Sequence, residues 1–551
     1  MAQGGLRSHI FAAAPPPVGC GHLVIMTWVI HKEDETDSFT SVFSQDIGCE
    51  RKRKSVVDRA AEKGHNISVQ KEVAEDEHEK IKKIVHRSFL PSRGIIKIVG
   101  LSVFAVSFAY LAFLELNANS SVILDRSATL SSNSSSPLKA YKLWRIDGEY
   151  YNFEPLLQKH PGGQLPLLQG RGRDVSVLFQ VHHLGTRPSV ALKQYKVDGP
   201  VVGKVGDVPE YSFEPNGFYM TLKGRVRDAL QKEIGETSAR KPSTFYMLKF
   251  ASNVVFFSGS WLYLAFYASS TPVAVMHAVS RLVLLGFAHD AVHTTLLPKS
   301  PSLQLRARDF IFRAFLQNSA DWWHQEHIHL HHPYTKTDKD PNENLNQRVP
   351  LWRLTNRTQW AARHSFPVFS HLFISALQTE FMLVFDSKGF FRERPEKQCR
   401  ILVNVAAQVF FHFFPFFSYP LIEAVKLFSL TSVFPSVMVA LAFHSSHGAE
   451  DLEFRHRPGI DWGEYQLRTT SGFASSGISG TLDSHIEHHL FPMLSNDNQH
   501  FIRNIVVETA QEFGIPYHER GSFMEFIWTH FKYMVTLGSP SSLGIIKEVH
   551  L

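Results

Sequence analysis

Three groups of histidines dominate the chemistry that this sequence can support. They read HDAVH at 289–293, HQEHIHLHH at 324–332 and HIEHH at 485–489. Residues three or four apart share one face of a helix, so we expect these imidazoles to converge: His289 with His293, His327 with His331, and His485 with His488 and His489. Neutral imidazole is a good ligand for iron, zinc, copper and nickel. A single pair would fit a polar helix face equally well, but three groups predict a metal site.

A second metal-binding signature lies upstream, where HPGG occupies 160–163. Pro161 fixes φ at a sharp turn, and the two glycines let the backbone approach a flat ligand closely. With GlyArgAspValSerValLeuPheGlnValHisHis at 172–183, this region resembles the cytochrome b5 haem domain. The resemblance implies haem b between His160 and His183, because Phe179 supplies the spacing Phe-x-x-x-His, with His182 as the alternative. An iron held by two imidazoles has no open position and therefore transfers electrons.

Long apolar stretches separate and position the histidine groups. Crossing a bilayer takes roughly 20 residues, and we expect spans at 245–267, 272–288, 400–418 and 421–443. The first two spans are joined by a short uncharged turn, and so are the last two, which predicts that both turns lie on the lumenal side. Region 299–400 is rich in Lys and Arg, which predicts that it lies in the cytosol. Two membrane hairpins then bring all three groups and the haem domain to one face. Apolar stretches at 310–316 and 366–385 are expected to be helices lying in the interface.

The remaining chain is divided by composition. Residues 1–94 carry mixed charge and few aromatics, which indicates a disordered or targeting extension. An apolar helix of undecided topology at 95–116 is followed by a linker at 117–140. We assign the other boundaries as a haem domain at 141–198, a linker at 199–240, a membrane domain at 241–538 and a tail at 539–551.

Composition narrows the class of protein. A chain of 551 residues is too long for one ordinary core. Phenylalanine alone numbers 44, which suits a protein that faces acyl chains. The net charge of +6 gives no argument for nucleic acid as a partner. Three cysteines without a CxxC motif, Cys20, Cys49 and Cys399, favour a reducing compartment and exclude a disulfide framework.

The full order of motifs resembles the membrane front-end fatty acid desaturases that carry an N-terminal cytochrome b5 domain. HPGG, HDxxH, WWxxxHxxxHHxYT and IEHHLFP follow one another between about Tyr141 and Gly538. The resemblance implies an all-α multi-pass membrane desaturase domain, with four spans, interfacial helices and a cytosolic cap, fused to a small α+β cytochrome b5-like domain.

The resemblance also implies a centre of two non-haem irons. Carried over residue by residue, the ligands are His289, His293, His327, His331, His332, His447, His485, His488 and His489. His444 competes with His447 for the position after the fourth span. His485 stands where front-end desaturases usually have Gln, although other membrane desaturases have His there. His324 and His329 are extra histidines, expected beside the ligands or at the surface.

Other polar and aromatic residues near the groups have two interpretations. Asp290, Asp338, Asp340 and Glu487 either cap helices at the surface or orient ligand imidazoles. Trp322 and Trp323 either line an acyl tunnel or anchor the interface. We expect no catalytic residue beyond the metal ligands.

The expected reaction follows from these parts. Removing hydrogen from an unactivated CH2 group needs an oxidant stronger than any side chain, and two irons can generate one from O2. The sequence has no GxGxxG in a strand–turn–helix setting. Electrons should therefore arrive through the fused haem from a separate NADH-dependent cytochrome b5 reductase.

We accordingly expect O2-dependent desaturation of a long-chain polyunsaturated fatty acyl chain, presented as a membrane lipid or acyl-CoA. The expected location is the endoplasmic reticulum membrane, with both metal sites in the cytosol. A sphingoid-base desaturase or acyl hydroxylase would share these motifs. A haem electron carrier with an inactive membrane part is the alternative from another class.

Overall fold

The structure of the chain is a computed structural model. The structure describes residues 138–205, 210–293, 295–296, 301–316, 320–341, 353, 359–386, 395–452, 456–474 and 483–540. The predicted extension, the apolar helix at 95–116, nearly all of the first linker and most of the tail lie outside these residues. Every described residue belongs to one compact unit, which lies within Pro91–Leu551.

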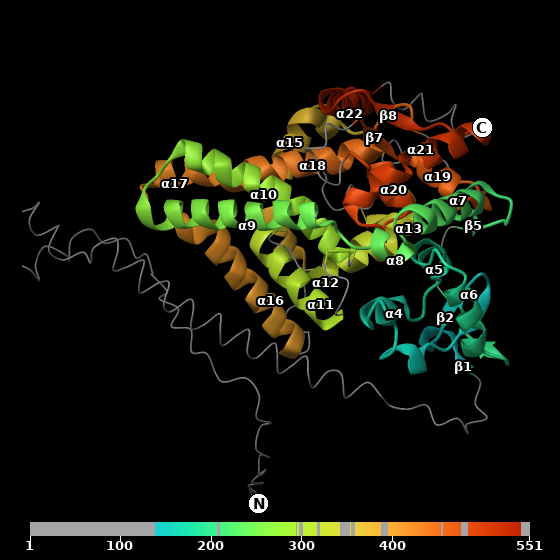
Figure 1. The fold of residues 1–551 in the computed structure, drawn as a ribbon. Coiled ribbons are helices and arrows are strands. Elements are labelled where there is room, and N and C mark those ends of the chain that lie inside the picture. The colour runs from blue at the N-terminus through green and yellow to red at the C-terminus, as the bar shows by residue number, and fades with distance from the viewer. Residues whose placement is uncertain are drawn as a thin grey trace, which may run out of the picture. The chain divides into compact units, whose positions relative to one another are not determined.

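The N-terminal described part is a small α+β domain (Figure 1). Its elements are β1 (Leu138–Lys139), the 3-10 turn η1 (Ala140–Lys142), β2 (Trp144–Ile146), β3 (Glu149–Tyr151), η2 (Glu154–Leu156), α4 (Leu165–Gly170), α5 (Ser176–His182), α6 (Arg187–Leu192), η3 (Lys193–Tyr195) and β4 (Val201–Val202). Strands β2 and β3 form an antiparallel hairpin. Its turn is Asp147–Gly148, both at positive φ, as a two-residue Asp-Gly turn requires. Trp144, Ile146, Tyr151 and Phe153 form the domain core.

The rest of the described chain is mainly helical. Its first half contains β5 (Tyr211–Ser212), α7 (Phe218–Glu233), α8 (Glu236–Ala239), α9 (Thr244–Leu262), the π segment η4 (Tyr263–Tyr267), α10 (Thr271–Val292), α11 (Pro301–Ile311), the π segment η5 (Phe312–Leu316), α12 (Ala320–Trp323), the π segment η6 (His324–His331), α13 (His332–Tyr334) and the 3-10 turn η7 (Ala362–His364).

The second half completes the helical part. It contains α15 (Pro367–Asp386), α16 (Pro395–Gln408), the π segment η9 (Val409–Phe413), the 3-10 turn η10 (Phe414–Phe416), α17 (Leu421–Phe428), the π segment η11 (Ser429–Val433), α18 (Phe434–His447), β6 (Ile460–Asp461), α19 (Trp462–Thr469), β7 (Ser471–Phe473), α20 (His485–Leu490), α21 (Asn496–Glu512), β8 (His518–Arg520) and α22 (Phe523–Gly538).

Apolar helices cover each of the four predicted spans. Among the described residues, however, only Thr271–Val292 and Leu421–His447 are both long and apolar enough to cross a membrane. Helix α9 is 19 residues long and includes Lys249, and α16 begins with a charged turn. The predicted count of four spans is therefore not confirmed. The two stretches predicted to lie in the interface are helical, in η5 and α15.

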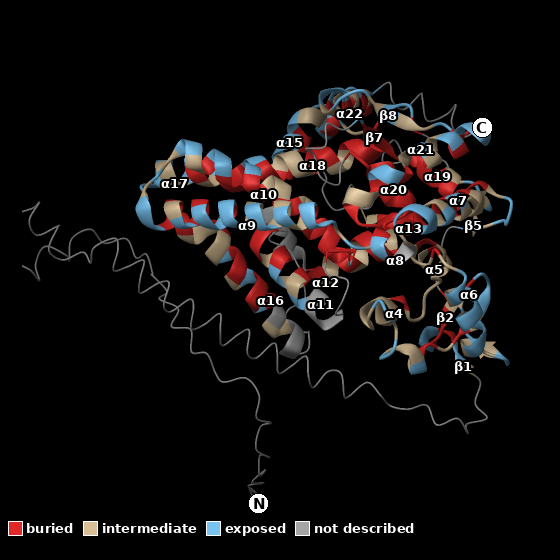
Figure 2. Ribbon diagram, viewed as in Figure 1, coloured by how far each residue is buried: buried red, intermediate tan, exposed pale blue. Residues whose placement is uncertain are grey.

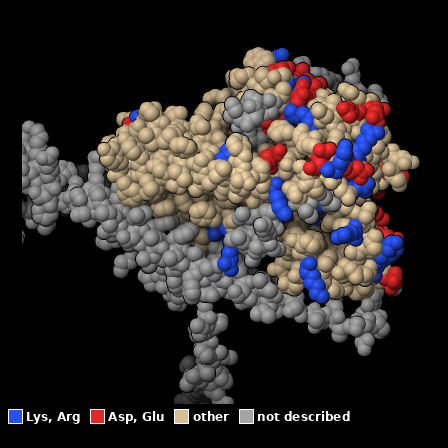
Figure 3. Space-filling model, viewed as in Figure 1, with Lys and Arg blue, Asp and Glu red and all other residues tan. Residues whose placement is uncertain are grey.

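The apolar helices expose hydrophobic side chains on their outer faces. Ile422 is 86% exposed and Tyr267 is 80% exposed, which is unusual for large apolar groups in water. Figure 3 shows few charged side chains over α9, α10 and α17, whereas charges gather over the C-terminal elements. Figure 2 shows buried residues concentrated where α10, α13, α18 and α20 meet. The apolar helices therefore suit a lipid surround, and their buried ends form the core.

A buried arginine joins three of these apolar elements. Arg281 of α10 is 1% exposed, so its charge needs partners within the bundle. Its Nε donates to the carbonyl of Phe315 in η5 at 3.0 Å, and its Nη1 donates to the carbonyl of Thr431 in η11 at 2.9 Å. Both acceptors lie in π segments. Arg281 thus fixes the position of α10, whose last turn carries the first histidine group.

The C-terminal cap rests on a large apolar cluster. Trp462, Leu490 and Phe491 pack there with Phe218 and Tyr219 of α7. Two short parallel sheets support it, β5 with β6 and β7 with β8. The expectation of an all-α membrane domain did not include these sheets, because strands of two or three residues leave no clear periodicity. The cap holds α20, which carries the third histidine group.

Candidate metal centres

Four helix ends bring nine histidines together. Helix α10 ends at the first group, and η6 leads directly into α13 at the second. Helix α18 ends at His447, and α20 contains the third group. None of the nine side chains is more than 7% exposed. The structure therefore brings together the complete ligand set expected from the sequence: His289, His293, His327, His331, His332, His447, His485, His488 and His489.

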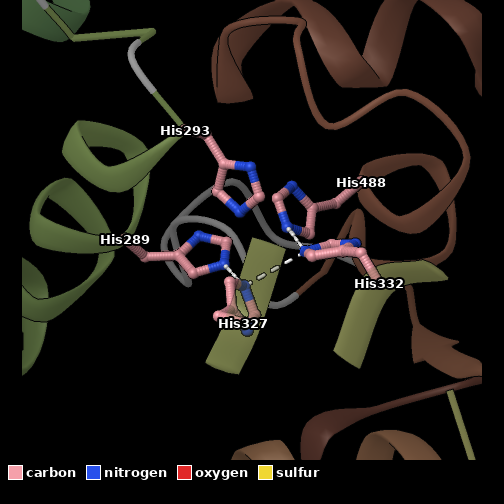
Figure 4. Close-up of side chains that lie close together, drawn as sticks. All are labelled: His289, His293, His327, His332 and His488. Atoms are coloured by element: carbon pink, nitrogen blue, oxygen red, sulfur yellow. Dashed lines mark hydrogen bonds between the residues drawn. The ribbon is translucent and has the colours of Figure 1, made fainter. Parts of the chain in front are cut away.

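The nine histidines form two neighbouring groups. In the first group, the ligand atoms of five residues lie within 4.8 Å of one another (Figure 4): His289, His293, His327, His332 and His488. The corresponding atoms of His331, His447 and His489 form the second group. Nε2 of His485 lies 3.2 Å from Nε2 of His447, which adds His485 to the second group.

The pairing within the second histidine motif differs from the helical expectation. We expected His327 to converge with His331 at a spacing of four. Instead, Nε2 of His327 lies 3.1 Å from Nε2 of His332, and His331 belongs to the other group. The reason is local: η6 is a π segment, whose turns contain an extra residue, so positions five apart meet. One element thereby serves both groups.

The distances between imidazoles fit metal coordination. Nε2 of His289 lies 2.8 Å from Nε2 of His327, and Nε2 of His488 lies 3.1 Å from Nε2 of His332. Neighbouring ligands at right angles around an ion, each about 2.1 Å from it, stand about 3 Å apart. Both ring nitrogens of His293 and Nε2 of His489 are buried without a hydrogen-bond partner among the described residues. Such atoms are costly unless an ion uses them.

Burial also sets the protonation state of these imidazoles. It lowers the pKa of His327, His332, His488 and His489 well below the ordinary value, and neighbouring histidines lower the pKa further. The rings are therefore neutral at physiological pH. Neutral imidazole is the form that binds a metal.

The haem signature produces a second, smaller site in the N-terminal domain. The ring centroids of His160 and His183 are 6.2 Å apart. Two imidazoles on opposite sides of one iron, each about 2 Å from it, stand at about this separation. Nδ1 of His160 contacts the carbonyl of Gly163 at 3.1 Å, and Nδ1 of His183 contacts that of Phe179 at 2.8 Å. Both Nε2 atoms are therefore left for a ligand between the rings.

The surroundings of this pair fit a haem. A Cβ at Gly162 would approach Cε1 of His160 to 3.0 Å, so HPGG packs tightly around the imidazole. Phe179 lies against the ring of His183, with ring centroids 4.8 Å apart, and also packs on the apolar core of the domain. Burial lowers the pKa of His183 to about 3, which keeps its ring neutral. His182, the alternative ligand, makes the same kind of contact, from its Nδ1 to the carbonyl of Leu178 at 3.1 Å. The pairing of the His160 and His183 rings is what favours His183.

Comparison with known proteins agrees with both sites. The fatty acid desaturase family model matches residues 247–521, and the cytochrome b5-like haem/steroid binding domain matches 129–206. Delta(5) fatty acid desaturase A of Dictyostelium discoideum is 26% identical over 72% of this chain and 90% of that protein. Acyl-lipid (8-3)-desaturase of Mortierella alpina is 26% identical over 71% of this chain and 93% of its own length. The chain belongs to the fatty acid desaturases.

A further relative is named after cytochrome b5. A cytochrome b5-related protein of Drosophila virilis is 36% identical over 104 residues, which are 19% of this chain and 70% of that protein. The desaturase therefore joins a haem-binding electron-transfer domain to a membrane-associated di-iron desaturase domain acting on fatty acyl chains. The expected enzyme class and cofactors are confirmed.

Neighbouring side chains and backbone groups contact the Nδ1 atoms of several of the nine histidines. Nδ1 of His489 contacts Oε1 of Gln466 at 3.0 Å, and Nδ1 of His447 contacts the carbonyl of Thr469 at 3.0 Å. The amide of Gln499 lies 3.2 Å from Nδ1 of His488. These contacts aim Nε2 toward the shared centre. We did not predict Gln466, Thr469 or Gln499, because no motif marks them.

The four acidic residues singled out in the sequence differ in their roles. Asp340 accepts from Nδ1 of His331 at 3.1 Å and from the backbone of Lys336, so it orients an imidazole. Asp290 accepts a hydrogen bond from Tyr246 and lies 3.9 Å from Nδ1 of His289. Glu487 accepts from Tyr517 at 2.6 Å, away from the imidazoles. Asp338 is exposed.

The competing and extra histidines lie outside both groups. His444 packs beside His371, with ring centroids 5.0 Å apart. His324 and His329 are buried, and their ring centroids are 5.4 Å apart. Trp323 stacks on the ring of His327 at 5.1 Å and therefore covers part of the site.

Proposed function

We propose that this desaturase inserts a double bond at carbon 5 of a polyunsaturated acyl chain carried by a membrane lipid. The existing double bond at carbon 8 would lie farther from the carboxyl end. The support comes from relatives named Delta(5) fatty acid desaturase and acyl-lipid (8-3)-desaturase, which match along at least 90% of their own lengths. An acyl-CoA, a sphingoid base or a hydroxylated product are the alternatives that product analysis would reveal.

The ligand assignment is supported by one observation: the nine buried imidazoles lie together in a single cluster, the histidine nest. We propose one iron held by the first group, and the other by His331, His447, His485 and His489. His160 and His183 would bind the haem. When bound, the iron pair supplies the O2 chemistry that side chains lack, and the haem supplies electrons from an NADH-dependent cytochrome b5 reductase. His485 thus takes the place of the usual Gln as a ligand.

We further propose that the chain crosses the endoplasmic reticulum membrane four times, with both metal sites in the cytosol. Helices cover all four apolar stretches. Helices α10 and α18 both end at the histidine nest, as two hairpins entering from the same side would require. The domain boundaries expected from the sequence, 141–198 for the haem domain and 241–538 for the membrane domain, belong to the same proposal.

Expression in yeast with fed fatty acids tests the regiospecificity. Fatty acid methyl esters from cells given a 20-carbon acid unsaturated at carbon 8 should contain a product with a new double bond at carbon 5. A double bond at another position would overturn the proposed regiospecificity. A hydroxylated product, or unsaturated sphingoid bases alone, would overturn the fatty acyl reaction.

Metal analysis of the purified protein tests the ligand assignment independently. We expect about three irons per chain, one in haem and two non-haem. One iron per chain, in haem alone, would favour an electron carrier with an inactive membrane part.

A further inference from the structure

Three histidines that neither metal centre uses lie where the haem domain meets the desaturase domain. They are His182, next to the proposed haem ligand, and His324 and His329 of η6. His324 and His329 are buried, and His182 is half-buried. Desolvation lowers the pKa of His182 to about 4 and of His329 to about 3. Buried imidazoles are usually kept because they contact something, so their surroundings identify what the interface holds.

The haem domain contacts η6 directly through one glutamine. Gln169 of α4 accepts a hydrogen bond from Nδ1 of His324 at 2.5 Å and donates from Nε2 to the carbonyl of Asp321 at 3.4 Å. Helix α4 lies beside η6. The ring of His329 lies 5.4 Å from that of His324, and its two nitrogens have no hydrogen-bond partner among the described residues. Gln169 and His324 therefore form the polar centre of the contact.

Apolar and charged contacts surround this centre. Leu178 of α5 packs on the same apolar cluster as Trp323 and Ile328. Val177 and Val181 of α5 pack with α7 of the cap, and Nζ of Lys223 donates to the carbonyl of Gln180 at 2.7 Å. The contact is thus buried and closely packed, as expected for a permanent interface rather than a transient encounter.

The contact joins the two proposed metal sites by short stretches of chain. On one side, α5 ends at His182 and is followed by His183. On the other side, η6 contains His324 and also His327 and His331, one from each group of iron ligands. Trp323 stacks on His327 at 5.1 Å. A shift at the contact would change the separation of the two centres.

We propose that Gln169, His324 and His329 form an intramolecular dock that holds the haem domain at η6 and sets the rate of electron transfer to the iron pair. The inference rests on the proposed ligand assignment. In the step concerned, one electron leaves ferrous haem, which becomes ferric, and one ferric non-haem iron becomes ferrous. Gln169 and His324 are positioning residues: they touch neither substrate nor metal. Electrons then pass within one chain and need no free cytochrome.

Haem reoxidation measures this step apart from product formation. The full chain in detergent, loaded with haem and iron, is reduced anaerobically by NADH and a cytochrome b5 reductase and then mixed with O2. Stopped-flow absorbance follows the loss of ferrous haem. Protein with His488→Ala, expected to lack non-haem iron, gives the background of direct haem oxidation.

Two single variants and their combination probe the dock. Gln169→Ala and His324→Ala should each slow iron-dependent reoxidation about tenfold, equivalent to about 1.4 kcal/mol. The double variant should be no slower than Gln169→Ala, because that single variant already removes the contact between Gln169 and His324. His324→Gln, which keeps a donor, should restore most of the rate. Gln158→Ala is the matched control, since exposed Gln158 bonds only Gln164 within the haem domain.

Iron content, haem potential and a chemical bypass separate the possible outcomes. The dock requires unchanged iron content and haem midpoint potential in both variants. Rates within twofold of the parent, or loss of iron, would overturn it. Reducing the irons directly with dithionite and methyl viologen should restore a single turnover in both variants. If the unmodified protein forms no product after direct chemical reduction of its irons, the proposed function is contradicted. Slow haem reoxidation in the two variants would still support the dock in that case.

Discussion

The two metal-binding regions of this desaturase anchor their imidazoles in opposite ways. In the haem domain, each Nδ1 contacts a backbone carbonyl three or four residues away, at Gly163 and Phe179. In the di-iron nest, Nδ1 of His489 contacts Gln466, 23 residues away, and that of His447 contacts Thr469, 22 residues away. The proposed haem ligands are thus oriented by their own turns, and several of the proposed iron ligands are oriented by other elements.

This difference explains how far each site depends on the fold around it. A locally anchored pair needs only its helix ends and turn. A nest that draws ligands from α10, η6, α13, α18 and α20 needs the whole membrane domain and its cap. We therefore expect loss of haem and loss of non-haem iron to be separable.

The largest effect should follow removal of an iron ligand. His489→Ala should abolish the desaturated product and remove non-haem iron, because a buried site loses one of its neutral imidazoles. Haem absorbance should persist, since its ligands are anchored locally. Methyl ester analysis and the iron-to-haem ratio measure both effects. Half-exposed His500 on α21 supplies the control, His500→Ala, and full product from the His489 variant would contradict the assignment.

The converse experiment removes a haem ligand. His160→Ala should eliminate the haem spectrum while non-haem iron stays at about two per chain. Product should fall to the level that a host electron carrier can support. Retention of the haem spectrum would exclude His160 as a ligand. Simultaneous loss of both metals would mean that the two regions do not fold independently.

A smaller effect is expected when a side chain that orients an imidazole from a distant part of the sequence is replaced. Gln466 contacts Nδ1 of His489 and donates to the carbonyl of His332 at 3.2 Å. Gln466→Ala should lower iron affinity or activity about 10- to 100-fold, which is typical for a group that orients a ligand. Iron titration and turnover measure the change. Gln511→Ala on the exposed face of α21 should behave like the parent, and an equal loss there would contradict a specific role for Gln466.

The smallest effect concerns pH. Burial lowers the pKa of His530 to about 4, while its Nδ1 contacts the carbonyl of Gly448 at 2.8 Å. Below pH about 6.5 His530 becomes protonated in the unfolded chain, whereas in the native protein its ring stays neutral until about pH 4. The free energy of unfolding therefore decreases as the pH falls from about 6.5 toward about 4. His530→Phe should flatten this dependence by up to about 1.4 kcal/mol per pH unit. Unchanged slopes of Tm against pH would contradict it.

The clustering of the histidines could largely be predicted from the sequence, because they occur in short motifs. His160, His289 and His488 are marked by HPGG, HDAVH and HIEHH. The division of the nest into two groups could not be predicted, since it depends on the π turn that separates His331 from His332. Gln466 and Gln499 were also missed, because no sequence pattern distinguishes them from other glutamines in helices. Their role becomes visible only when the structure shows which imidazole each one contacts.

The fold shows the same contrast. Long apolar stretches predicted α10 and α18 by their length. The paired strands β5 and β6 were not predicted, because each contributes only two residues and the partners, Tyr211 with Ile460 and Ser212 with Asp461, are 249 positions apart in the sequence. Such contacts depend on tertiary structure and leave no local period.

Arg281 has a consequence for motion along the bundle. Its guanidinium is tied to the carbonyls of Phe315 and Thr431 on two neighbouring elements. A piston-like slide of α10 would break both ties inside an apolar medium, where replacements are absent. His289 lies eight residues further on, about 12 Å along the axis. The level of His289 along the bundle therefore depends in part on the two hydrogen bonds of Arg281, which resist an axial shift of α10.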